Sequence, residues 1–216
     1  MSAGVRLERL IASRPWTSRR RGRAADRPDP LLWTRRALPL AAAALLLLSL
    51  LVPYWQVILF APQYPGGLRA YVYLTHVGGD AQEISTLNHY IGMPGLEAAA
   101  PLERRLAIPL FVLAATALLL SAYARPLRAR WLRLLLRLPA GLLPVGVVAD
   151  LTYWLWWIGH TIDPAAPIRI EPFMPVILGR GRIMQFGTIA WFSAGFFLAV
   201  AAAVLALYDF FRERRA

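Results

Sequence analysis

Four long apolar runs constrain this chain more than any other feature of its sequence. Each run approaches or exceeds the ~20 residues that a helix needs to cross ~30 Å of hydrocarbon, and only the third carries a charge, at Asp150. A chain of 216 residues is too short to bury four such helices in water, so the runs must face lipid. The predicted membrane spans are 37–60, 106–124, 138–158 and 187–208.

Composition excludes several classes of protein. The chain is 58% hydrophobic and 17% charged, which is too apolar for an ordinary soluble globule. The formal net charge of +12 could attract nucleic acid or anionic lipid, but the basic residues gather at the edges of the apolar runs. We therefore expect the lipid bilayer and not nucleic acid as the partner. The chain has no cysteine, which excludes disulfides, zinc–thiolate sites, iron–sulfur clusters and haem attached through cysteine.

Arginine placement predicts the topology. Eighteen arginines fall in the N-terminal tail, the connector after the second run and the C-terminus, whereas six fall in the two other loops. By the positive-inside rule, both termini are cytoplasmic and those two loops are outside. The predicted fold class is an all-α integral membrane protein with four transmembrane helices and two structured extracytoplasmic loops. The predicted segments beside the spans are a basic cytoplasmic tail (1–36), outer loop 1 (61–105), a basic cytoplasmic connector (125–137), outer loop 2 (159–186) and a cytoplasmic tail (209–216).

The first outer loop is too long to be a simple connection. Residues 61–67 are typical of a turn, 68–77 alternate loosely as in a short strand, and 81–91 are typical of a short helix. His89 and Met93 are four residues apart, which places both on one side of that helix. The second outer loop holds His160 and four prolines, and no regular element is predicted there. We expect it to cover the first loop.

All three histidines, and every methionine beyond the first residue, fall on the predicted outer side. Imidazole with thioether is a ligand set that suits copper, especially Cu(I). His89 and Met93 are the leading candidates for metal ligands, with His160 next and His76 last. In the alternative interpretation, His89 forms hydrogen bonds within the loop, Met93 packs against the membrane face, and His76 lies on a solvated strand face.

Asp150 is an ionisable residue inside an apolar run. Such residues usually face a partner or a wet cavity, because a charge within hydrocarbon costs on the order of 3 kcal/mol on insertion scales. Asp150 either handles protons or ions, or it is a buried carboxyl bonded to a hydroxyl or an indole N–H of a neighbouring helix. The nearby Trp154, Trp156 and Trp157 are typical of a membrane-interface belt; stacking on a quinone or haem is the alternative.

Motifs for catalysis are missing from the sequence. Ser85 and Ser193 have no nucleophile-elbow context, and there is neither a glycine-rich phosphate loop nor an H-E-x-x-H segment. We therefore expect a protein that is not an enzyme.

The outer loops resemble a known family. Residues 61–68 read Ala-Pro-Gln-Tyr-Pro-Gly-Gly-Leu, and residues 87–93 read Leu-Asn-His-Tyr-Ile-Gly-Met. Together with Gly159-His160 and Asp163-Pro164, they resemble a family of small bacterial multi-span membrane proteins associated with accessory genes of nitrous-oxide respiration. The resemblance covers both outer loops and leaves out the tail at 1–36. It implies a place in the bacterial cytoplasmic (inner) membrane, and it assigns a copper role first to His89 and Met93.

Three hypotheses for function follow. The first is a membrane accessory protein whose extracytoplasmic cap handles copper or docks a periplasmic copper enzyme. The second is a membrane subunit in quinone or electron transfer, with other membrane subunits as partners. The third is a small ion or solute transporter that uses Asp150.

Overall fold

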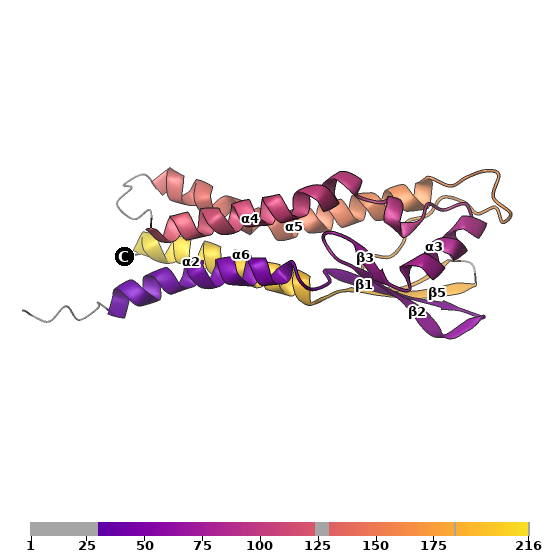
Figure 1. Cartoon of the computed structure of the whole chain (residues 1–216), viewed down its shortest axis with the longest axis horizontal. Helices are drawn as coiled ribbons and strands as arrows, with labels where there is room; N and C mark the ends of the chain where they lie inside the picture. Colours follow the sequence, from indigo (N-terminus) through magenta and orange to yellow (C-terminus); the bar gives the residue numbers. More distant parts are fainter. Residues whose placement is uncertain (1–29, 124–129, 184, 216) are drawn as a thin grey trace, which may run out of the picture. The chain divides into compact units, whose positions relative to one another are not determined.

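The prediction of an all-α protein with four spans is wrong. The computed structural model describes residues 30–123, 130–183 and 185–215, and in them five α-helices accompany a five-stranded antiparallel sheet (Figure 1). Three of these helices are long and apolar enough to cross a membrane. They are Pro101–Tyr123, Trp131–His160 and Ala194–Arg212. The basic tail up to residue 29 and residues 124–129 of the predicted connector lie outside the described residues.

The first apolar run is part helix and part strand. Helix α2 (Pro30–Ser49) ends eleven residues before the predicted span does, and its apolar part covers only Arg36–Ser49. Pro53 then follows, a residue that disfavours helix both at its own position and just before it. Strand β1 (Trp55–Ala61) takes up the rest of the run with β-branched and aromatic residues. Hydropathy alone does not distinguish such a buried strand from a membrane helix.

The fourth apolar run is divided in the same way. Strand β5 (Phe186–Phe192) occupies its first residues, and helix α6 (Ala194–Arg215) begins only after Ser193. Strand β1 lies at the centre of the sheet and pairs with β5 on one side, where Trp55 faces Phe192. The sequence of β1 is almost wholly apolar, and Trp55, Leu59 and Ala61 of this strand are buried.

The sheet joins two segments that are far apart in the sequence. Its strand order is β3-β2-β1-β5-β4, so strands that lie before Pro101 in the sequence and strands that lie after His160 form one sheet. Strands β2 (Tyr64–Val72) and β3 (Val77–Gly79) follow β1, and β4 (Gly179–Ile183) precedes β5. We call the described residues of 50–100 and 161–193 the cap. Outer loop 2 therefore contains strand β4, and the predicted fourth span contains most of β5; the sequence predicted neither strand.

One short helix covers part of the sheet. Helix α3 (Ala81–Tyr90) matches the predicted helix at 81–91. Its buried Ile84 packs with Leu59, Leu68 and Ala70 of the strands. This apolar contact fixes α3, and with it the histidine near its C-terminal end, on the cap.

The long helices pack through small side chains. Helices α4 (Pro101–Tyr123), α5 (Arg130–His160) and α6 contact one another in sequence order (Figure 1). Alanine dominates their shared core, and small residues let helix backbones approach closely, as they do in membrane helix bundles. The buried residues of this core include Ala42, Ala43, Leu46, Ala114, Ala115, Leu118, Ala140, Ala199, Ala202 and Ala206.

A buried ion pair joins α5 and α6 near the ends of these helices that lie opposite the cap. Arg137 Nη2 lies 2.7 Å from Asp209 Oδ2, and the two side chains are only 1% and 2% exposed. The sequence placed Arg137 in a connector at the headgroups, whereas α5 begins at Arg130 and turns Arg137 inward. A paired charge can be buried where a single one cannot.

Candidate functional site

The cap has a recess lined by two of the four predicted metal ligands. His89 and Met93 line this recess of about 410 Å³ together with Asp163, which the sequence did not suggest as a ligand. His89 is exposed, whereas Met93 is only 7% exposed. Met93 also packs with Ile91, so its thioether is held in the wall of the recess.

Backbone hydrogen bonds build the recess from both outer loops. Asp163 N donates to Gly92 O at 2.8 Å, and Ile168 N donates to Tyr90 O at 3.1 Å. The expected contact between the second outer loop and the first is therefore present. Gly92 has a φ of +76°, and a Cβ there would lie 2.7 Å from Asp163 O. Only glycine fits this turn without strain.

The other two histidines lie outside this recess. His160, at the C-terminal end of α5, stacks on Trp156 at 4.7 Å, and its Nδ1 lies 2.8 Å from Trp156 O. His76 stacks on Tyr73 at 4.4 Å. Among the described residues, no three histidine or acidic side chains come together as a metal site. The structure thus brings His89 and Met93 together and leaves His160 and His76 out of their recess.

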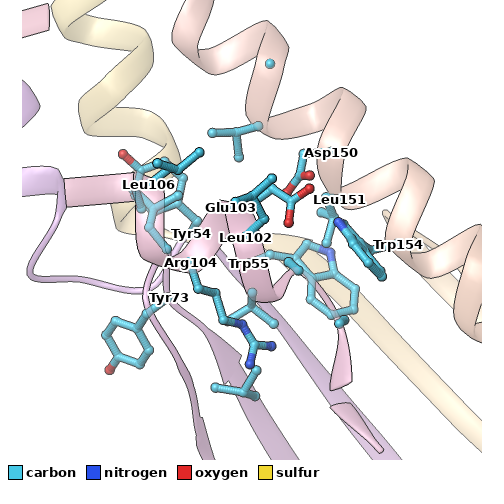
Figure 2. Close-up of a pocket in the computed structure, with 18 of the residues that line it drawn as sticks. Tyr54, Trp55, Tyr73, Leu102, Glu103, Arg104, Leu106, Asp150, Leu151 and Trp154 are labelled. Atoms are coloured by element: carbon cyan, nitrogen blue, oxygen red, sulfur yellow. The ribbon is translucent and has the colours of Figure 1, made fainter. Parts of the chain in front are cut away.

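A second cavity surrounds Asp150. It has a volume of about 330 Å³ and lies where α4 and α5 meet the strands (Figure 2). Its walls are mainly aliphatic and aromatic, and its few charged residues are Glu103, Arg104 and Asp150. Glu103 comes from the first turn of α4 and Asp150 from the middle of α5, and their carboxyl groups lie close together (Figure 2).

Hydrogen bonding in this second cavity is incomplete. Glu103 Oε2 is buried and makes no hydrogen bond to any described residue, whereas the buried indole of Trp154 interacts with the carboxyl of Asp150. Arg104 does not neutralise the carboxyl pair, because its guanidinium points away and lies 3.4 Å from Glu97 Oε2 (Figure 2). It also donates to Leu96 O at 2.9 Å. Buried polar groups normally have partners, so the unpaired Glu103 Oε2 needs an explanation.

Tyr54 forms part of the wall of the same cavity. Its hydroxyl lies 2.6 Å from Ser49 Oγ, and Ser49 Oγ in turn donates to Leu46 O. Burial raises the pKa of the Tyr54 phenol to about 12, and the hydrogen bond with Ser49 opposes this shift. The phenol is therefore neutral and held in one orientation at ordinary pH.

Sequence reasoning found Asp150 but missed the groups around it. Glu103 was placed in outer loop 1, although α4 begins at Pro101 and contains it. Trp154 was assigned to an interface belt, yet it lines the cavity beside Asp150. The available signal was the position of two carboxylates, Glu103 just before one apolar run and Asp150 within the next. One interpretation of Asp150 was a buried carboxyl bonded to an indole N–H of a neighbouring helix. An indole does lie beside Asp150, but it is that of Trp154, which belongs to the same helix.

The comparisons with known proteins place this chain in no family. No known family matches its sequence, and no curated protein matches it.

Proposed function

We propose that this chain is a non-enzymatic accessory protein of the bacterial inner membrane that crosses the bilayer several times. Its cap lies outside the cytoplasm and handles copper or docks a copper enzyme of the nitrous-oxide respiration type. The observation that carries the proposal is that His89 and Met93 line one recess, with Asp163 beside them. Imidazole and thioether suit Cu(I), and the carboxylate adds negative charge near the cation.

The arrangement of the three apolar helices supports this orientation. Helix α4 begins at the cap, α5 ends there and α6 begins there. The opposite ends of these helices carry the arginines of the connector and of the C-terminus, including Arg133 and Arg212. Because arginine is retained on the cytoplasmic side, the cap belongs on the other side.

The site is suited to transfer and not to permanent storage of a metal. His89 is exposed and Met93 is nearly buried, so an incoming Cu(I) would meet the imidazole first and the thioether second. Two soft ligands with open positions leave room for a ligand from a partner protein. A docking copper enzyme would supply it.

Copper titration of the purified full-length protein tests this proposal. Cu(I) is added in competition with a chromophoric chelator, and the affinity is compared among wild type, His89→Ala and Met93→Ala. We expect each variant to bind about tenfold more weakly or worse, because loss of a ligand costs at least as much as loss of a supporting residue. His76→Ala is the matched control, since His76 is also exposed but lies outside the recess. Equal loading of all four proteins would overturn copper handling at this recess.

A further inference from the structure

We infer that the cavity between α4, α5 and the sheet binds a quinol, a flat aromatic diol on an apolar tail. The cavity is separate from the recess at His89, so this inference goes beyond the proposed function. The argument depends on three properties of the cavity: its polar atoms, its aromatic walls and its opening.

The polar end of the cavity limits the chemistry of the ligand. Glu103 Oε2 is an acceptor that lacks a donor among the described residues. The indole of Trp154 already interacts with the carboxyl of Asp150. A hydroxyl group suits this end, because it can donate a hydrogen bond to Glu103 and its oxygen can also accept one from the indole. A metal ion would serve Glu103 but would not fill the apolar and aromatic walls. A ligand with only carbonyl oxygens could not donate to either carboxyl group.

Asp150 provides a further acceptor beside the first. Its carboxyl lies close to that of Glu103, and Trp154 is adjacent to both (Figure 2). Arg104, which could otherwise pair with these groups, is held by Glu97 and by Leu96 O. The polar end of the cavity therefore presents acceptors to the hydroxyl groups of a ligand.

The walls suit a flat ring. A volume of about 330 Å³ falls within the range of sites for small organic ligands. Aromatic rings are well matched by aromatic walls through edge and offset stacking. The aromatic residues that line the cavity are Tyr54, Trp55, Tyr73, Phe111, Trp154 and Phe192.

The cavity opens toward the side of the helices that faces lipid. Leu102, Leu106 and Leu110 line it, yet they are 61%, 42% and 49% exposed. Gly146 of α5 also lines it, and a Cβ at this position would meet no atom within 4 Å. A ligand dissolved in the bilayer can enter here with its head toward Glu103 and its tail along the helices.

Binding of decylubiquinol tests the inference. The full-length protein in detergent is titrated anaerobically with this quinol, and quenching of tryptophan fluorescence reports binding. We expect saturable binding to wild type, and about tenfold weaker binding to Glu103→Gln and to Trp154→Phe, as expected for loss of one hydrogen bond to a charged or buried group. Asp150→Asn should also weaken binding. The oxidised form, decylubiquinone, should bind more weakly than the quinol because it has no hydroxyl to donate.

A steric variant tests whether the ligand occupies the cavity, without changing the polar side chains. Gly146→Phe fills the opening without touching Glu103 or Trp154, so it should abolish quinol binding. Val145→Phe is the matched control, because Val145 is the neighbouring exposed residue and does not line the cavity. Thermal unfolding of each variant checks that it is folded. Absence of quinol binding to wild type, or equal binding to wild type and Gly146→Phe, would mean a water-filled cavity only and would overturn the inference.

Discussion

Tyr54 connects the long helices to the sheet through both its backbone and its side chain. Its N–H donates to Val72 O at 2.8 Å, and its carbonyl accepts from Ser193 N at 2.9 Å. These hydrogen bonds extend the pairing of β1 with β2 and β5 toward the helices. The Tyr54 hydroxyl forms a hydrogen bond with Ser49 at the end of α2. Gly195 lies against the ring, where a Cβ would come within 2.6 Å of Tyr54 Cδ2. A single aromatic residue thus orients several elements.

The raised pKa of Tyr54 predicts a pH dependence of stability. The phenol has a pKa of 10.0 when unfolded and about 12 when folded, so the native state favours the neutral form. This contribution is present in full below pH 10 and is lost as the pH rises through 12. We expect the stability of wild type to fall over this window more steeply than that of Tyr54→Phe, measured by chemical denaturation. Parallel curves for the two proteins would contradict the assignment.

Gly92 controls the recess in the cap. Gly92→Ala places a methyl group 2.7 Å from Asp163 O at a φ of +76°. We expect the second outer loop to separate from α3, at a cost of about 1–3 kcal/mol for the strained backbone. Hydrogen exchange of the Asp163 amide, which Gly92 O protects, should speed up. In Gly66→Ala the added Cβ meets nothing within 4 Å, so exchange at Asp163 should stay at the wild-type rate.

Helices α5 and α6 are joined by a charge pair in an otherwise apolar contact. Arg137 and Asp209 satisfy each other where neither could be left alone. The pair also fixes how the two helices are aligned along their axes, because a slide of one turn would separate the charges. Packing of alanines alone would specify this alignment less sharply.

Breaking this pair should be costly, and removing both charges should not. We expect Arg137→Met to lose about 3–5 kcal/mol of stability, because Asp209 is then buried without its cation. The double variant Arg137→Met with Asp209→Leu should recover most of the loss. Arg212→Met, at an exposed arginine of α6, should change stability by less than about 0.5 kcal/mol. Unfolding in graded denaturant checks all three, and a double variant as weak as the single one would refute the pairing argument.

At the scale of the whole molecule, apolar runs predicted the helices but not the sheet. The prediction held for the span at 106–124, which lies largely within α4, and for the short helix at 81–91. It was wrong for 55–61 and 186–192, because these strands are apolar on both faces and continue directly from or into apolar helices. Pro53 and the β-branched Val57 and Ile58 were the local signs of a strand.

The residues of the candidate sites were also predicted only in part from the sequence. The pair His89 and Met93 was predicted from helical spacing, but α3 ends at Tyr90, so Met93 lies beyond the helix and lines the recess after the turn at Gly92. Asp163 joins them only through the docking of a loop seventy residues later. Glu103 meets Asp150 only because α4 and α5 run antiparallel beside each other. Contacts of this kind depend on tertiary structure, and a single sequence does not reveal them. The electron-transfer and transporter hypotheses remain predictions.

The order of the strands has a consequence for biogenesis. Strand β1 is made early, but its partner β5 is translated only after α4 and α5. Until then the growing chain carries an apolar strand with one unpaired edge, which is prone to form a non-native pair with another strand. The helical hairpin of α4 and α5 lies between these two strands in the sequence, so it is made before this edge can close. Completion of the sheet therefore follows synthesis of both helices, and every strand of the cap precedes α6 in the sequence.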